Sequence, residues 1–267
     1  MHEVKPKVFL IAETRTDYDA VQAMLDLQGW TTPYTDKLVN DNANSDNDAQ
    51  FLTEISGRMC YRSFGVGLNP NVTKIREDSK EYIRNTLEKG DGSIFEHASL
   101  TFAFMNVSRI FTHELVRHRV GVAISQESMR YVRITDIGMW LPGELTEKQR
   151  SIMDAAARDA ELNYRDLEET CNWEKMTMPQ KKAMTSAMRR IIPDGIATNI
   201  VWTTNHRNLR HVLEQRTDPA AEIEIRQVFD EVGHMVTEKY PLIYQDFVRT
   251  AQDDGLGWWK ATLRRKV

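Results

Sequence analysis

The chain has 267 residues, of which 41% are hydrophobic and 28% are charged, and its formal net charge is −4. These values are ordinary for a globular protein with a sizeable core, and they exclude a collagen-like or disordered chain. No apolar run approaches the roughly 20 residues of a membrane helix, and the N-terminus has no secretory signal pattern, so we expect no membrane partner and a cytoplasmic location. The two cysteines, Cys60 and Cys171, lack zinc-site spacing and indicate free thiols in a reducing compartment.

The hydrophobic pattern, followed in chain order, predicts many helices and few strands. Residues 36–50 are rich in Asn and Asp and predict a loop. The strand predictions are residues 8–12, 100–104, 128–134 and 197–203. The helix predictions are residues 17–29, 51–61, 72–89, 106–119, 146–169, 180–192, 205–215, 221–240 and 241–250.

This order of elements indicates an α/β (α+β) fold in which a mixed sheet of modest size has flanking helices. We divide the chain into an N-terminal extension with an Asn/Asp-rich loop, residues 1–50, and a main domain, residues 51–267.

Two stretches of the chain are basic although the whole chain is acidic. Residues 107–134 hold five Lys or Arg against two acids, and residues 181–216 hold seven against two. Local positive charge in an acidic protein suits small anionic ligands, whereas a duplex-binding protein is more often basic overall. We therefore expect phosphate-bearing small molecules and no nucleic acid, although solvated helix faces would give the same pattern.

Three consecutive basic residues, Arg117, His118 and Arg119, end the helix predicted over 106–119. Successive helical residues point about 100° apart, so the three cannot share one solvated face. They either stabilise the helix C-terminus through its dipole or fan out around several anionic groups. His113 lies five residues before His118, not the four of a zinc-protease helix, so no metal site is predicted.

Two further clusters of polar residues follow. Residues 125–131 bring hydroxyl, amide, carboxylate and guanidinium groups into one segment, which suits either a nucleotide or a polar turn. Arg207 and His211 lie at i and i+4 on one face of a predicted helix, which Asn205 is placed to cap. Arg189 lies near another helix end, where a structural role is equally open.

In this order, the segments resemble the flavin-dependent thymidylate synthase family. Residues 117–131, RHRVGVAISQESMRY, are similar to its signature of Arg-His-Arg, seven or eight residues, Ser and then Arg-Tyr. Residues 90–98, GDGSIFEHA, are similar to its Gly-His-x-Ser/Thr-x-x-Glu-His stretch, with Asp91 in place of the family's His. Arg189 and residues 202–216, WTTNHRNLRHVLEQR, are further matches, and the resemblance covers roughly residues 51–247.

The resemblance implies an enzyme that methylates dUMP to dTMP without a cysteine nucleophile. It implies 5,10-methylenetetrahydrofolate as the one-carbon donor, NADPH-reduced FAD as the hydride source, and a homotetramer with shared active sites. The FAD-binding residues would be Ser93, Arg117, His118, Arg119, Asn205, Arg207 and His211. The dUMP-binding residues would be Glu114, Gln126, Glu127, Ser128, Arg130, Arg189 and Arg216. Two of these would be catalytic, Arg216 by polarising the uracil and Ser128 as a ligand-binding hydroxyl.

Two other functions remain open on the same residues. A flavoprotein of similar fold would act only as an NADPH oxidase, which folate-dependent dTMP formation distinguishes. A non-catalytic nucleic-acid-binding module would use the Arg-rich stretches, and its affinity would fall steeply with salt. Cys60 lies between Arg58 and Arg62, so charge alone does not exclude it as a nucleophile, but neither cysteine lies in a basic stretch.

Overall fold

A four-stranded antiparallel sheet forms the centre of the molecule, with the strand order β2-β3-β6-β4. The computed structural model describes residues 1–46, 48–66, 72, 74–134 and 136–263. The strands of the central sheet are β2 (Lys7–Glu13), β3 (Ser99–Ser108), β6 (Ala197–Asn205) and β4 (Val122–Gln126). Two smaller sheets have two strands each. In one, β1 (His2–Glu3) pairs in parallel with β5 (Gly138–Met139). In the other, β7 (Phe247–Ala251) and β8 (Gly257–Ala261) form an antiparallel hairpin.

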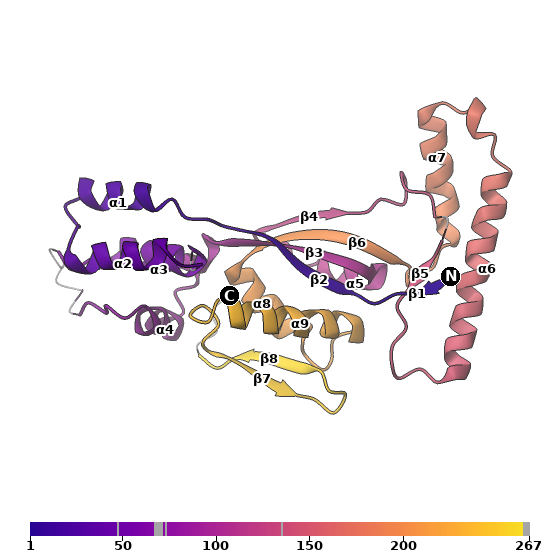
Figure 1. Cartoon of the computed structure of the whole chain (residues 1–267). Helices are drawn as coiled ribbons and strands as arrows, with labels where there is room; N and C mark the ends of the chain where they lie inside the picture. Colours follow the sequence, from indigo (N-terminus) through magenta and orange to yellow (C-terminus); the bar gives the residue numbers. More distant parts are fainter. Residues whose placement is uncertain (47, 67–71, 73, 135, 264–267) are drawn as a thin grey trace.

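Helices surround this sheet in three groups (Figure 1). One end carries α1 (Tyr18–Leu27), α2 (Pro33–Ala43), α3 (Asp48–Tyr61) and α4 (Ser79–Lys89). The other end carries α6 (Glu147–Glu169) and α7 (Met178–Met188). Between them lie α5 (Arg109–Leu115), α8 (His206–Arg216) and α9 (Ile223–Lys239). Short 3-10 helices are η1 (Gly92–Glu96), η2 (Trp173–Lys175) and η3 (Arg189–Ile191).

One face of the sheet forms the main core. Phe102 and Phe104 of β3 and Trp202 of β6 are fully buried, as strand alternation requires when one face is covered. Phe229 of α9 lies 5.9 Å from Phe104 and 6.0 Å from Trp202, measured between ring centroids. The sheet therefore packs on α9 through an aromatic cluster, which holds β3 and β6 as a rigid base for the loops at their ends.

The predicted fold class is confirmed, because helices flank sheets that have both parallel and antiparallel pairs. Strands were predicted correctly at residues 8–12, 100–104 and 197–203. The helix predicted over 72–89 begins later, at Ser79, where Asp78 caps it, and residue 73 lies outside the described residues. The division after residue 50 stays a prediction. None of the described helices is both long and apolar enough to cross a membrane.

The loop predicted over residues 36–50 is wrong, because α2 and the start of α3 occupy most of it. Thr32 and Thr35 form a capping box, and Pro33 occupies the first helical turn, so the helix begins from strong local signals. Leu38 and Val39 of this helix are buried, although most of its other residues are polar. Residue 47 lies outside the described residues.

The strand predicted over 128–134 is also wrong. The edge strand β4 lies earlier, over Val122–Gln126, and the chain then turns, with the Val132 amide donating to the Ser128 carbonyl at 3.0 Å. The helix predicted over 106–119 is shorter at both ends, because β3 continues to Ser108 past a bulge and α5 ends at Leu115, so the basic residues 117–119 follow the helix and do not form its last turn. Asn106 has a φ of 59° at that bulge, a left-handed conformation that Asn tolerates better than most residues.

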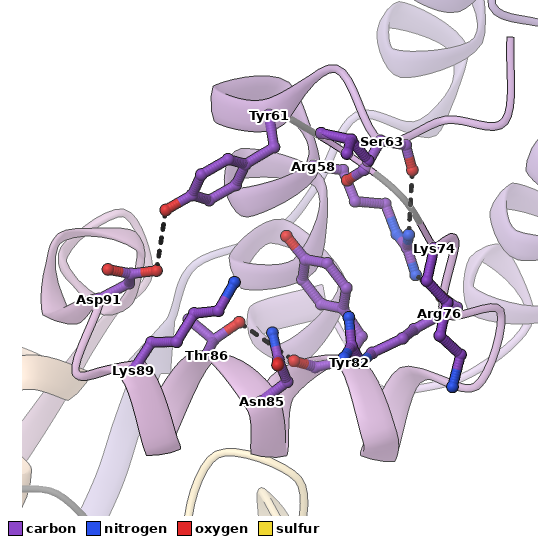
Figure 2. A pocket seen from close by; sticks show the side chains of 11 residues that line it. Arg58, Tyr61, Ser63, Lys74, Arg76, Tyr82, Asn85, Thr86, Lys89 and Asp91 are labelled. Carbon is purple, nitrogen blue, oxygen red and sulfur yellow. Dashed lines mark hydrogen bonds between the residues drawn. The ribbon is translucent and has the colours of Figure 1, made fainter. Parts of the chain in front are cut away.

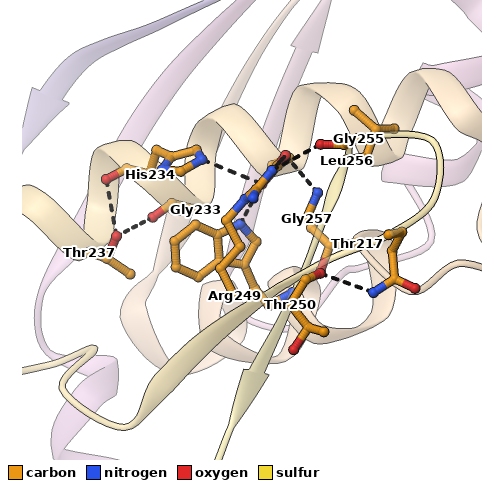
Figure 3. A network of polar contacts seen from close by, with 12 residues as sticks. Thr217, Gly233, His234, Thr237, Arg249, Thr250, Gly255, Leu256 and Gly257 are labelled. Atoms are coloured by element: carbon orange, nitrogen blue, oxygen red, sulfur yellow. Dashed lines mark hydrogen bonds and ion pairs between the residues drawn. The ribbon is translucent and has the colours of Figure 1, made fainter.

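The helix predicted over 241–250 is replaced by turns and by β7. Proline at position 241 lies two residues after the end of α9. Arg249 and Gly257 of the hairpin that comes next lie beside α9 in Figure 3, and both donate to Asp230 of that helix. The Asp230 carboxylate accepts hydrogen bonds from Arg249 Nε at 2.8 Å and from Trp259 Nε1 at 2.8 Å. This tertiary attachment, absent from the local pattern, makes the segment a strand.

Candidate active site

The junction of β3 with α5 is fixed by a buried carboxylate. Ser108 caps α5 by accepting a hydrogen bond from the Phe111 amide at 3.0 Å. The Ser108 amide donates to Glu224 Oε1 at 2.7 Å, and the Ser108 hydroxyl donates to the other oxygen. Glu224 is only 2% exposed, and this burial raises its pKa to about 7, with the neighbouring Glu222 acting in the same direction. The orientation of α5 therefore depends on one residue of α9.

We expect the free energy of unfolding of Glu224→Gln to rise relative to that of wild type as the pH rises. A carboxyl whose folded pKa is raised from 4.5 to about 7 binds a proton in the folded chain after the unfolded chain has lost it, so stability falls between these values. The expected change is about 3 kcal/mol in the difference of unfolding free energies. Urea unfolding at pH 4.5 and 8 measures it, with exposed Glu238→Gln of the same helix as control. A pH-independent difference would contradict the assignment.

Arg216, at the end of α8, is bound by two residues from the α5 segment. Its Nη1 donates to Glu114 Oε2 at 2.6 Å, and its Nη2 donates to the Glu114 carbonyl at 2.9 Å. Its Nε donates to His118 Nε2 at 2.7 Å. The structure thus brings Arg216 into contact with Glu114 and His118, two predicted site residues about a hundred positions earlier in the sequence. These contacts fix the plane of the Arg216 guanidinium.

The electrostatics of this cluster favour a neutral imidazole beside a half-buried cation. Burial, followed by the charges of Arg216 and His211, lowers the pKa of His118 to about 4. His118 is therefore neutral at physiological pH and accepts the Arg216 hydrogen bond through Nε2. Burial also lowers the pKa of Arg216, and the Glu114 carboxylate opposes that shift. Little water screens this cation, so it acts strongly on a nearby developing charge.

Several predicted flavin-binding residues lie around the start of α8. Asn205 caps α8 by accepting a hydrogen bond from the Asn208 amide at 2.9 Å. Gly121 has a φ of 65°, and a Cβ there would lie 2.3 Å from the Asn205 side-chain nitrogen, so only glycine fits. The His211 ring lies 6.1 Å from that of His118. Asn205, His211 and the segment after His118 therefore meet at one place.

The remaining flavin candidates are less tightly held. Arg207 forms an ion pair with Glu96, which ties α8 to η1, the 3-10 helix that carries Ser93. Arg117 and Arg119 are exposed and have no ion pair among the residues that the structure describes. Exposed guanidiniums beside the neutral His118 are the kind of donors that the diphosphate of a dinucleotide needs. This chemistry makes the residues candidates for holding a dinucleotide cofactor.

The predicted substrate residues of the 125–131 segment follow the edge strand. Gln126 donates to the Thr112 hydroxyl at 3.1 Å, which places it against α5. The Glu127 carboxylate accepts a hydrogen bond from the side-chain amide nitrogen of Asn199 at 2.8 Å. The Ser128 hydroxyl accepts from the Arg130 amide at 3.3 Å within its own turn. Ser128 and the exposed Arg130 make no side-chain contact with Arg216 in the described structure.

Asp91, the departure from the family pattern, faces a pocket between α3 and α4 (Figure 2). The pocket has a volume of about 260 Å³, and basic side chains such as Lys74, Arg76 and Lys89 contribute to its lining. The Tyr61 hydroxyl donates to Asp91 at 3.0 Å. The Asp91 carboxylate is thereby held toward α3.

Some contacts of this site were missed by the sequence analysis. These contacts are the ion pair of Glu96 with Arg207 and the hydrogen bonds of Asn199 with Glu127 and of Glu224 with Ser108. They were missed because the two residues of each pair lie far apart in the sequence. Arg109 was also missed, although it lies in the first basic stretch; its Nη2 donates to the Glu127 carbonyl at 3.1 Å. The basic stretch was the one sequence signal that could have indicated Arg109.

Comparison with known proteins places this chain in a family. Residues 38–242 match the family model described as thymidylate synthase complementing protein. The chain therefore belongs to the thymidylate synthase complementing protein family.

Relatives with assigned names extend this comparison over most of the chain. A probable flavin-dependent thymidylate synthase of Mycobacterium phage L5 is 32% identical over 247 residues, which is 90% of this chain and 96% of the relative. The flavin-dependent thymidylate synthase of Mycobacterium tuberculosis is 32% identical over 210 residues, 76% of this chain and 82% of the relative. That of Corynebacterium efficiens is 32% identical over 213 residues, 78% and 83% respectively.

Proposed function

We propose that this thymidylate synthase converts dUMP to dTMP with FAD, NADPH and 5,10-methylenetetrahydrofolate. The folate methylene carbon forms a bond to C5 of the uracil, C5 loses its proton, and the folate leaves as tetrahydrofolate. The new carbon becomes a methyl group by gaining a hydride, and NADPH ends as NADP⁺. Bound flavin supplies the hydride chemistry. Family membership and the geometry around Arg216 support this proposal.

The arrangement of Arg216 is the observation that carries the proposal. Its three nitrogens each donate one hydrogen bond to Glu114 or His118. One N–H on each terminal nitrogen has no partner among the described residues and is available to a ligand. A half-buried cation with free donors suits the carbonyl oxygen of a uracil that gains negative charge during bond formation at C5. Arg216 would thus bind and polarise the base without covalent chemistry.

The roles of the other predicted residues belong to the same proposal. Ser93, Arg117, His118, Arg119, Asn205, Arg207 and His211 would hold FAD, and Glu114, Gln126, Glu127, Ser128, Arg130 and Arg189 would hold dUMP with Arg216. The neutral His118 and the cations around it support a flavin site. Held by Tyr61 on the α3 side, the Asp91 carboxylate would be turned from the flavin ring.

A homotetramer with shared active sites is part of the proposal. On the face of the central sheet opposite α9, Phe9 is 48% exposed and Val201 is 37% exposed within the part of the chain that the structure describes. Ile11 on the edge strand β2 is 55% exposed. An apolar sheet face of this kind is typical of a subunit interface. Free cysteines support a cytoplasmic location, because the Cys60 thiol is exposed and unpaired.

The cysteine-free mechanism predicts that the Cys60→Ser, Cys171→Ser double variant keeps its activity. Neither thiol contacts the Arg216 cluster: Cys171 donates to the Leu167 carbonyl on α6, and Cys60 lies on α3. We expect kcat for dTMP formation within about two-fold of wild type, since surface substitutions rarely matter. The assay measures dTMP with and without the folate.

Three outcomes of this assay carry separate meanings. Loss of dTMP formation by Cys60→Ser, with flavin still bound, would show a thiol mechanism. NADPH consumption that never yields dTMP would show an oxidase. A wild-type chain that binds duplex DNA in a salt-dependent way and forms no dTMP would support the nucleic-acid alternative.

A further inference from the structure

Thr217 follows Arg216 directly at the end of α8, and it joins that helix to the β7–β8 hairpin (Figure 3). Its hydroxyl donates a hydrogen bond to the Leu213 carbonyl at 2.6 Å and accepts one from the Trp259 amide at 2.9 Å. Thr217 and Leu213 are fully buried. One buried hydroxyl therefore ties the residue after Arg216 both to its own helix and to β8.

Glu214, two residues before Arg216, makes two further contacts with the same strand. Its carbonyl accepts a hydrogen bond from Trp258 Nε1 at 3.3 Å, and its carboxylate accepts one from the Ala261 amide at 2.9 Å. The last carbonyls of a helix have no partner within that helix, so a donor from outside is what this turn needs. The chain on both sides of Arg216 is thus bound by β8.

The hairpin in turn is attached to α9. Asp230 of this helix accepts hydrogen bonds from the Gly257 amide and from Trp259 Nε1, both at 2.8 Å. A Cβ at Gly233 would lie 2.4 Å from Trp259 Nε1, so glycine is what allows the indole to lie directly on α9. Because α9 packs on the central sheet through Phe229, β8 reaches the end of α8 from a fixed base.

Arg216 needs such support because it is the last residue of its helix, and helix ends fray. Its hydrogen bonds with Glu114 and His118 fix the guanidinium, whereas the contacts of Glu214 and Thr217 fix the backbone that carries it. A displacement of about 1 Å in an active site costs up to about 10²-fold in rate. The position of the guanidinium therefore depends on the hairpin as well as on the α5 segment.

We propose that Thr217 is a positioning residue for the reaction, through which the β7–β8 hairpin holds Arg216 in place. The inference rests on the proposed function, because Arg216 is the group that is positioned. It gives the C-terminal hairpin a role in catalysis besides its role in stability. Thr217 acts through Arg216 and not on a ligand, since it is fully buried between Leu213 and β8.

The test removes the Thr217 hydroxyl with and without Arg216 present. Thr217→Val keeps the shape of the side chain, and we expect it to lower kcat for dTMP formation, per bound flavin, by about 10-fold with KM for dUMP within about three-fold of wild type. Thr217→Ser keeps the hydroxyl and should recover most of the loss. In the Arg216→Ala background, Thr217→Val should lower kcat by less than about two-fold, because no guanidinium is left to position.

Thr237→Val serves as the control, because Thr237 of α9 donates to the Gly233 carbonyl at 2.7 Å and loses the same kind of helix hydrogen bond. Its kcat should stay within about two-fold of wild type. Trp258→Phe breaks the attachment from the hairpin side by removing the donor to the Glu214 carbonyl, and it should lower kcat by about three-fold. If Thr217→Val does not fold, Trp258→Phe with and without Arg216→Ala decides the question.

Two results would overturn the inference and leave the proposed function standing. One is an unchanged kcat in both Thr217→Val and Trp258→Phe. The other is a loss of kcat that is equally large in the Arg216→Ala background, which would mean that the hairpin acts on the protein as a whole. A wild-type chain that binds flavin and forms no dTMP would overturn the proposed function and this inference together.

Discussion

Replacing Arg216 with alanine is expected to lower kcat for dTMP formation by roughly 10²–10³-fold, even at saturating dUMP. The guanidinium is fixed by Glu114 and His118, so its remaining donors are already aimed before charge develops on the base. A group that acts only as charge develops changes kcat itself, whereas a group that merely binds the ground state changes KM. Steady-state kinetics over a range of dUMP concentrations separates the two parameters.

Arg216→Lys should recover little of this loss. An ammonium has three donors, so it cannot donate to the Glu114 carboxylate, the Glu114 carbonyl and His118 and still offer a donor to a ligand. Arg158→Ala removes an exposed arginine from α6, where Arg158 pairs with Asp154 at 2.7 Å, and serves as the control for loss of charge. A change confined to KM in Arg216→Ala would mean that this residue only binds the substrate.

The second large effect expected concerns the fold: Asp230→Ala should lower the free energy of unfolding by about 3–5 kcal/mol. Burial raises the pKa of Asp230, but hydrogen bonds from Arg249, the Gly257 amide and Trp259 outweigh it, so the net shift is downward. The network joins α9 to both strands of the β7–β8 hairpin (Figure 3). Removing the carboxylate leaves the Arg249 charge and two buried N–H groups without their acceptor.

Urea unfolding at pH 7 measures this loss. Asp230→Asn should be intermediate, because an amide keeps one acceptor oxygen but not the charge. Asp253→Ala, at an exposed position in the turn of the same hairpin, is the matched control and should change stability by less than about 0.5 kcal/mol. A loss below about 1 kcal/mol for Asp230→Ala would mean that the hairpin is held mainly by its apolar contacts.

The sequence predicted those parts of the fold whose signals are local. The strands around Phe102 and Trp202 lie where they were predicted, and the helix predicted to end at residue 89 does end there, with Gly90 in the left-handed conformation as its cap. The α2 helix was missed because its Asn and Asp residues outweigh the few apolar positions, although Thr32 and Pro33 mark its start. The β7 strand was missed because its attachment to Asp230 is tertiary.

Candidate site residues were predictable in kind but not in arrangement. The basic stretches and the family resemblance indicate Glu114, His118 and Arg216, and the structure places them in mutual contact. The distances from Arg216 to the other two residues depend on how α8 packs beside α5, and these helices are about a hundred residues apart in the sequence. Glu224 could not be predicted as an important position, because its role arises from burial and from its distant partner Ser108.

Whether flavin and dUMP share one site can be measured from the absorption spectrum of the purified protein, recorded with FAD and titrated with dUMP. We expect a bound flavin whose absorption bands shift saturably with dUMP in wild type, because the residues proposed for both ligands lie together around α5 and α8. Arg216→Ala should keep the flavin spectrum and weaken or change the response to dUMP. A protein that binds no flavin, or a bound flavin whose spectrum is unaffected by saturating dUMP, would overturn the proposed function.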